Sequence, residues 1–173
     1  MHIRQAYESD IDLLVDLSRQ TFLETFAADN DPGDMTDYLN STFTHENLGA
    51  ELKNTGSLFL LGYPDSHRSR VIGYAHLIED CSVPNFTSRD PALQISRLYL
   101  KQSEIGKGYG SQLMQACLDR AKTQGLVTVW LGVWEHNHRA LQFYDRWEFK
   151  PVGTQTFNLG RDVQTDWILA RPV

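Results

Sequence analysis

The spacing of hydrophobic residues predicts helices and strands that alternate along the chain. A short apolar strand at 2–6 precedes a helix capped by Ser9 or Asp10. The face of this helix expected in the core carries Ile11, Leu14, Val15, Ser18, Phe22 and Phe26. The apolar residues of the next two helices are Met35, Leu39 and Phe43 and, after a Thr44 cap, Leu48 and Leu52.

Shorter runs with alternating polarity predict the strands. These runs span 57–63, 71–79, 93–100, 127–133, 149–158 and 162–170. The first two are expected to form a hairpin around the turn at 64–66, and the last two to pair through 158–161. The order predicts an α/β chain with a mixed sheet and helices on both faces.

A glycine-rich loop follows the strand at 93–100 and opens an amphipathic helix that Gly125 closes. The loop contains Gly106, Lys107, Gly108, Tyr109, Gly110 and Ser111. Glycine tolerates positive φ and lets a ligand approach the backbone, and amide groups at a helix N-terminus attract anions. The loop therefore predicts a pyrophosphate cradle, although a glycine-rich turn without a ligand remains an alternative. Its spacing matches neither a P-loop nor a dinucleotide-binding fingerprint.

A second strand and helix follow, and that helix carries Asn137, Ala140, Phe143 and Tyr144. With the loop at 105–110, this pattern resembles the GNAT superfamily of N-acetyltransferases, whose loop reads Gln/Arg-x-x-Gly-x-Gly/Ala and whose last helix reads Asn…Ala-x-x-Phe-Tyr. The resemblance implies one GNAT domain over residues 1–173, with a mixed sheet of about seven strands flanked by helices on both faces. It also implies acetyl-CoA as cosubstrate.

The resemblance further implies that strands 93–100 and 127–133 run parallel and part at their C-terminal ends. Pantetheine would then bond the freed backbone groups of Leu98 and Leu100, and the Leu98 amide or its neighbour would stabilise an oxyanion. Tyr144 would protonate the departing thiolate, or else only pack beside Phe143. Asn137 would bond the cofactor arm as well as cap its helix. The implied cofactor residues are Leu98, Tyr99, Leu100, Gly106, Lys107, Gly108, Tyr109, Gly110, Ser111, Asn137 and Tyr144.

A closer resemblance, through segments 21–26, 30–32, 130–135 and 164–166, is to bacterial PaiA-type spermidine/spermine N-acetyltransferases. It implies a small polyamine as acceptor and makes Glu24 the first candidate for the catalytic base, ahead of Glu79 and Asp80. The acidic segment 29–37 would gather a polycation, or would simply be solvated. Another amine acceptor, such as a peptide N-terminus, an aminoglycoside or an amino acid, and a non-catalytic coenzyme A sensor remain alternatives.

Two residues depart from the superfamily pattern. Ile105 stands where Gln or Arg is usual, so a side-chain contact to the cofactor is expected to be missing. Glu148 stands where glycine usually ends the last helix, so that helix must close without glycine or accept a strained backbone.

Composition narrows the remaining choices. A chain of 173 residues with 41% hydrophobic content suits a single core. Two cysteines and no apolar run of about 18 residues predict a cytoplasmic enzyme without disulfide, signal peptide or membrane span. The net charge of −6 disfavours nucleic acid as a partner, and His136 and His138 do not converge, so no metal is expected. The sequence leaves a homodimer open.

Overall fold

A seven-stranded mixed sheet forms the centre of the protein, which a computed structural model describes for residues 1–66, 69–84 and 91–173, except for the side chains of 80 and 81. The strand order is β1-β2-β3-β4-β5-β7-β6. The strands are β1 (His2–Gln5), β2 (Ser57–Tyr63), β3 (Gly73–Cys81), β4 (Ala92–Leu100), β5 (Thr128–Trp134), β6 (Lys150–Leu159) and β7 (Asp162–Pro172). Neighbouring strands are antiparallel except β4 and β5, which are parallel. The predicted mixed sheet and both predicted hairpins are confirmed.

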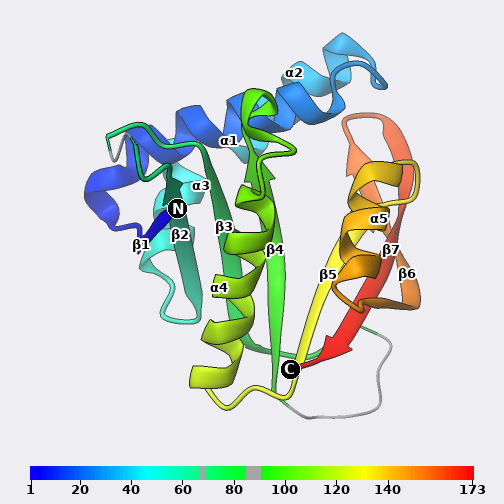
Figure 1. Cartoon of the computed structure of the whole chain (residues 1–173). Coiled ribbons are helices and arrows are strands. Elements are labelled where there is room, and N and C mark those ends of the chain that lie inside the picture. The colour runs from blue at the N-terminus through cyan, green and yellow to red at the C-terminus, as the bar shows by residue number, and fades with distance from the viewer. Residues whose placement is uncertain (67–68, 85–90) are drawn as a thin grey trace.

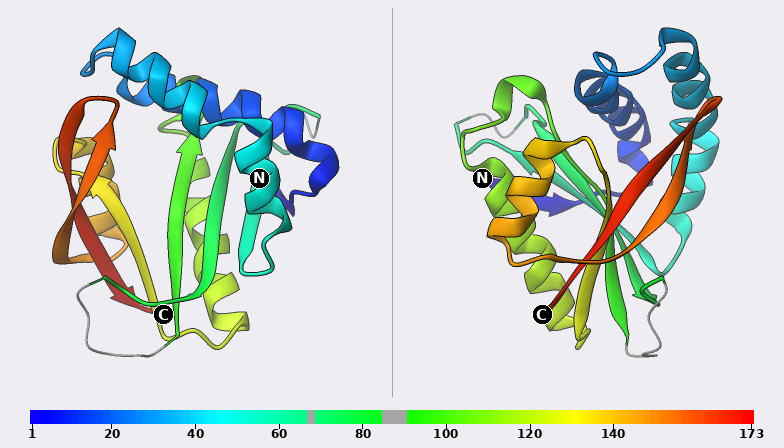
Figure 2. Two further views of the ribbon diagram at one scale, coloured as in Figure 1. Left: turned by 180° about the vertical axis from the view of Figure 1, so that it is seen from behind. Right: turned by 90° about the vertical axis from the view of Figure 1, so that its right-hand side faces the viewer.

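Five α-helices cover the two faces of the sheet (Figures 1 and 2). They are α1 (Ile11–Phe26), α2 (Pro32–Thr42), α3 (His45–Lys53), α4 (Tyr109–Thr123) and α5 (His138–Arg146). Helices α1, α2 and α3 lie on one face, and α4 and α5 lie on the other. Each face buries its own cluster of apolar side chains, one centred on Leu14 and Phe22 of α1 and one on Leu113 and Met114 of α4. The prediction of helices on both faces is confirmed.

The helix boundaries follow local hydrogen bonding. The Thr44 hydroxyl accepts from the Asn47 amide at 3.1 Å, so the predicted cap of α3 is confirmed. Asp10 is the N-cap residue of α1, as predicted, but its side chain makes no capping hydrogen bond to the helix. The Asp10 carboxylate instead accepts from the Arg4 guanidinium at 2.7 and 2.8 Å and from the Tyr7 amide at 2.9 Å. This ion pair attaches the start of α1 to β1.

Strands β4 and β5 pair only at their N-terminal ends. The paired residues run from Ala92 with Thr128 to Gln94 with Trp130, and beyond them the two strands diverge (Figure 1). This confirms the predicted splayed pair of parallel strands. The split leaves the second half of each strand with a neighbour on one side only.

Candidate active site

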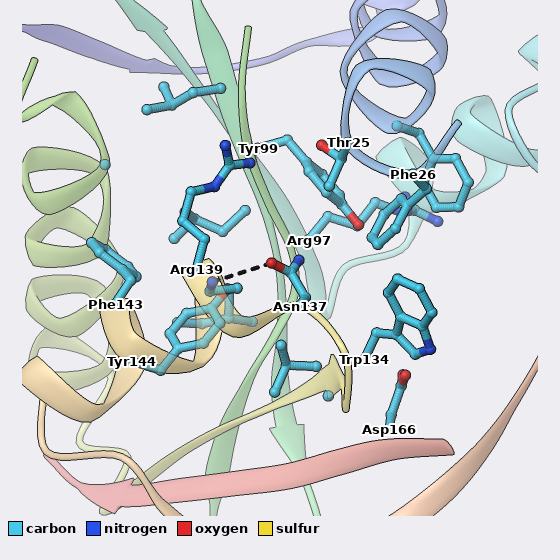
Figure 3. Close-up of a pocket in the computed structure, with 18 of the residues that line it drawn as sticks. Thr25, Phe26, Arg97, Tyr99, Trp134, Asn137, Arg139, Phe143, Tyr144 and Asp166 are labelled. Atoms are coloured by element: carbon cyan, nitrogen blue, oxygen red, sulfur yellow. Dashed lines mark hydrogen bonds between the residues drawn. The ribbon is translucent and has the colours of Figure 1, made fainter. Parts of the chain in front are cut away.

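A cavity of about 710 Å³ opens at the split between β4 and β5. Its walls come from α1, α2 and α5, the glycine-rich loop and strands β4 to β7 (Figure 3). The predicted residues among its lining are Leu98, Tyr99, Leu100, Gly106, Gly108, Gly110, Ser111, Asn137 and Tyr144. Lys107 and Tyr109, which were also predicted, lie outside this lining.

Backbone groups on both sides of the split point into it. The Lys101 amide donates to the Ile72 carbonyl at 2.9 Å, and hydrogen bonding alternates along an antiparallel ladder. The alternation turns Tyr99 toward β3 and turns the N–H and C=O of Leu98 and Leu100 toward the split. On the other side, the Glu135 amide donates to Thr165 at 3.1 Å, so the same alternation turns Gly132 and Trp134 toward the split.

These inward-facing groups have the geometry of a missing strand. An extended ligand with amide groups fits between Leu98 and Leu100 on β4 and Gly132 and Trp134 on β5. The sequence predicted the β4 side of this arrangement and missed the β5 side. The alternating direction of the backbone groups in residues 128–134 would have indicated the β5 side, but only once the pairing of β5 with β7 was known.

The glycine-rich loop opens α4 with two left-handed residues. Gly106 has a φ of 83° and Gly108, the N-cap of α4, a φ of 81°. A Cβ atom built on either residue would meet nothing within 4 Å, so the space beside both backbones is open. The buried Glu104 stabilises the loop. Its carboxylate accepts hydrogen bonds from Arg70 at 2.8 Å and from Lys107 at 3.1 Å. The open amides at the helix N-terminus suit an anionic ligand.

Helix α5 contributes polar groups at its first turn. The Asn137 side-chain oxygen accepts from the Ala140 amide at 3.2 Å, which confirms the cap and leaves the side-chain NH₂ group for a ligand (Figure 3). Arg139 lines the same cavity and is a cation that the sequence analysis missed. Ile105, which replaces the usual Gln or Arg, also lines the cavity. Arg139 thus adds a positive charge to a cavity in which Ile105 of the loop offers no polar side chain.

Tyr144 lies on the α4 and α5 face of the sheet. Its side chain is buried, lines the cavity and contacts Phe143 and Phe149 at ring distances of 5.4 and 5.8 Å. Burial raises the pKa of its phenol above the usual value, so the hydroxyl keeps its proton throughout the physiological range. A protonated phenol in this place can donate a hydrogen bond or a proton.

Asp166 lies on the opposite face, beside Trp134 of the neighbouring strand (Figure 3). Burial raises the pKa of its carboxyl, and the nearby Glu135 raises it further, while a hydrogen bond from Gln155 lowers it. A Cβ atom on Gly132 would lie 2.6 Å from Gln155 Nε2 and 3.4 Å from Asp166 Oδ2. Because Gly132 has no side chain, it leaves space beside the split for the Asp166 carboxylate and the Gln155 amide.

Six rings form what we call the aromatic wall on this face of the cavity: Phe22, Phe26, Tyr38, Tyr99, Trp134 and Phe157. Arg97 lies beside the wall, held by two hydrogen bonds to Glu51 at 2.6 and 2.8 Å and by a contact with His76 at 3.3 Å. The His76 pKa is lowered to about 3 by burial and by Arg97, so this ring is neutral. The side chain of Arg97 is only 14% exposed.

The sequence of this chain is similar to those of known acetyltransferases. A family model described as the acetyltransferase (GNAT) family matches residues 17–149. The chain belongs to the GNAT acetyltransferase family. It is 35% identical over 169 residues to an uncharacterized N-acetyltransferase encoded in the pepI 3′ region of Lactobacillus delbrueckii subsp. lactis, which covers 98% of this chain and 95% of that relative. It is also 37% identical over 105 residues to an uncharacterized N-acetyltransferase of Mycobacterium tuberculosis, over 61% of this chain and 62% of the relative.

Solved structures share the GNAT fold. The PaiA N-acetyltransferase of Thermoplasma acidophilum, solved in complex with coenzyme A, superposes with a TM-score of 0.77 at 22% identity, over 99% of this chain and 98% of that one. The ribosomal-protein-alanine N-acetyltransferase of Brucella melitensis gives a TM-score of 0.72 at 19% identity, over all of both chains. The predicted GNAT fold is confirmed, and the chain is an N-acetyltransferase.

The structure does not bring Glu24 to the cavity of this GNAT domain. Its carboxylate accepts from the Gln102 amide at 2.7 Å and from Gln20 at 2.8 Å, so it attaches α1 to the turn before the glycine-rich loop. Glu79 pairs with Arg120 at 2.5 Å, outside the cavity lining, and the Asp80 side chain lies outside the described residues. Asp166 is the carboxylate that the cavity holds instead. Asp166 belongs to segment 164–166, on which part of the resemblance rests. Its position on β7 is what shows that it reaches the cavity.

The acidic segment 29–37 also lies outside the cavity lining. The Asp31 carboxylate caps α2, and the buried Asp34 accepts from the Arg161 backbone and side chain at 3.1 Å. Among the described residues, no helix has the length and apolar character to cross a membrane. Within those same ranges, no three His, Cys, Asp or Glu side chains gather as a metal site would require.

Proposed function

We propose that this GNAT enzyme transfers the acetyl group of acetyl-CoA directly to a primary amine. The observation that carries the proposal is the split of β4 from β5, with inward-facing backbone groups and with Asp166 and Tyr144 on opposite faces of the sheet. Coenzyme A has a pantetheine arm with amides for the split and a pyrophosphate for the glycine-rich loop. The coenzyme A complex of the PaiA neighbour supports the same cofactor.

Asp166 accepts the first proton. A primary ammonium has a reference pKa of about 10.4, so an amine at pH 7 needs a base before it can attack. A carboxylate whose pKa is raised by burial is a stronger base than an ordinary aspartate, and it lies beside the split where the thioester carbonyl would be. The neutral amine nitrogen then bonds to that carbonyl carbon. The Leu98 amide, turned into the split, stabilises the negative charge that forms on the oxygen.

Tyr144 gives the second proton. When the carbon–sulfur bond breaks, the sulfur of coenzyme A leaves as a thiolate with a reference pKa of about 8.5. Burial raises the pKa of Tyr144, so its phenol still carries its proton when the thiolate forms and can donate it there. Two protons leave the amine nitrogen, the first to Asp166 before the attack and the second to water as the carbon–sulfur bond breaks. The sulfur takes up one proton from Tyr144, water reprotonates Tyr144, and Asp166 returns its proton to solvent, so that one proton is released per turnover.

A covalent acyl-enzyme is not needed. The buried Cys117 has its pKa raised to about 12 by desolvation, so its thiol is not nucleophilic at neutral pH. Among the described residues lining the cavity there is no cysteine. Direct attack by the amine is the chemistry that the described side chains support.

Spermidine or spermine is the acceptor that the resemblance to PaiA-type enzymes implies. Its support is the fold shared with a PaiA N-acetyltransferase and a carboxylate, Asp166, that would accept one ammonium. The test is thiol release from acetyl-CoA with spermidine, an aminoglycoside, a peptide N-terminus and a simple monoamine. Thiol release that depends on an amine supports acetyl transfer, and coenzyme A binding without thiol release from any amine would leave only a sensor.

A further inference from the structure

The acceptor side of the cavity is built mainly of rings. In the aromatic wall, neighbouring ring centroids lie close together. They are 5.4 Å apart for Phe157 and Tyr38, 4.7 Å for Tyr38 and Phe22, and 4.6 Å for Phe22 and Phe26. Phe26 in turn lies 6.2 Å from Trp134. Four of the five named rings (Phe26, Tyr38, Trp134 and Phe157) are only partly buried. The wall therefore offers an extended, contiguous aromatic surface to whatever enters the cavity.

Charge in the cavity suits one ammonium group. Asp166 is the single carboxylate among the described residues that line it, and Arg97 is the cation that lies beside the aromatic wall. A polycation needs a carboxylate for each ammonium along its length, and Glu51, the carboxylate beside Arg97, is already paired with that guanidinium at 2.6 and 2.8 Å. The carboxylates of segment 29–37 do not supply the missing charge, because Asp31 and Asp34 bind within the fold.

We propose, on the basis of the acetyl transfer proposed above and in place of the polyamine that the resemblance implies, that the acceptor is a monoamine with an aromatic body, of the arylalkylamine class. Its nitrogen lies at Asp166, and its ring packs in offset or edge contact on the aromatic wall. Among the described residues beside the wall, the ion pair of Arg97 with Glu51 leaves no free carboxylate for a second ammonium.

The test compares 2-phenylethylamine, butylamine and spermidine as acceptors. We expect kcat/KM for 2-phenylethylamine to exceed that of either aliphatic amine by roughly tenfold, because one aromatic contact is worth about a three- to tenfold preference and the wall offers several. The Phe157→Ala variant removes one ring of the wall. It should reduce the preference for 2-phenylethylamine over butylamine by about three- to tenfold.

The matched control is Trp167→Ala. Trp167 is an aromatic residue on β7 of the same hairpin, next to Asp166 in sequence but outside the cavity lining and 38% exposed. This variant should keep the wild-type preference. An equal loss in both variants would mean that the hairpin, and not the ring of Phe157, sets the preference, and would overturn the aromatic wall as the acceptor site.

Calorimetric titration of 2-phenylethylamine into protein saturated with coenzyme A separates this inference from the proposed reaction. Turnover of spermidine at higher kcat/KM than 2-phenylethylamine overturns the inference and leaves acetyl transfer intact. Binding of 2-phenylethylamine that Phe157→Ala weakens, without turnover of any amine, supports the inference and overturns the proposed reaction. Absence of both binding and turnover overturns both.

Discussion

Two glycines of α4 provide a matched pair for testing the pyrophosphate cradle. Gly108 begins the helix with a φ of 81°, and Gly125 follows its end with a φ of 69°. A Cβ atom would meet nothing within 4 Å at either position, so Gly→Ala costs backbone strain and no clash. That strain is about 1–2 kcal/mol in the left-handed region, which for a domain of this size lowers Tm by roughly 2–8 °C. We expect Gly108→Ala and Gly125→Ala to lose similar stability.

The two variants should differ in their response to acetyl-CoA. A ligand at about 100 times its Kd stabilises the folded state by about 2.7 kcal/mol, a rise in Tm of roughly 5–11 °C. Differential scanning fluorimetry should record this rise for wild type and Gly125→Ala. The methyl group of Gly108→Ala projects into the open space at the helix N-terminus and should abolish most of the rise. An equal rise in both variants would refute the cradle.

Four further predictions concern the reacting groups. Tyr144→Phe should lower kcat by about 10²–10⁴-fold with little change in the Kd for acetyl-CoA, as measured by thiol release and calorimetry; a loss below about tenfold would return Tyr144 to a packing role. Asp166→Asn should lower kcat/KM by a similar factor, and a variant with near wild-type turnover would exclude Asp166 as the base. Wild-type kcat/KM should rise with pH through a pKa above the usual aspartate value, because burial raises the Asp166 pKa, and this limb should be missing in Asp166→Asn. Burial of the ionised Asp166 carboxylate lowers the free energy of unfolding once the pH rises through its raised folded-state pKa. Asp166→Asn has no such charge and should therefore melt higher than wild type at pH 7. This difference in Tm should vanish below the unfolded-state pKa, where the carboxyl is protonated in both states.

Hydrophobic periodicity was sufficient for most of the fold. The β2–β3 hairpin and the helices with Leu14, Met35 and Leu48 on their buried faces follow from alternation and helical spacing, because burial selects those side chains. The side chain of Asp10, the predicted N-cap residue of α1, does not bond to the helix because it pairs with Arg4 of β1, and local sequence does not reveal that pairing. Glu148 accepts the strained backbone that the sequence analysis allowed for, with a φ of 64°.

The candidate site was predictable where it depends on backbone and on local motifs. Leu98, Leu100, Gly108 and Asn137 belong to continuous segments whose order and spacing carry the information. The carboxylate was different, since Asp166 reaches the cavity from a strand that joins the sheet between β5 and β6, next to Gly132. Glu24 was chosen by its neighbours in sequence, and the fold directs it to Gln102 instead. Charge composition could not show that the acidic segment is engaged within the fold.

A bisubstrate compound tests the central claim most directly. The claim is that coenzyme A and the amine bind on the two sides of one split, with Asp166 and Tyr144 on opposite faces of the sheet beside it. The compound joins the sulfur of coenzyme A through a methylene-carbonyl group to the nitrogen of the best acceptor, and its affinity is measured by calorimetric titration. We expect it to bind at least tenfold more tightly than coenzyme A, because the linked amine adds its contacts without a second association cost. An affinity equal to that of coenzyme A would contradict the claim, because the amine would then find no site across the split.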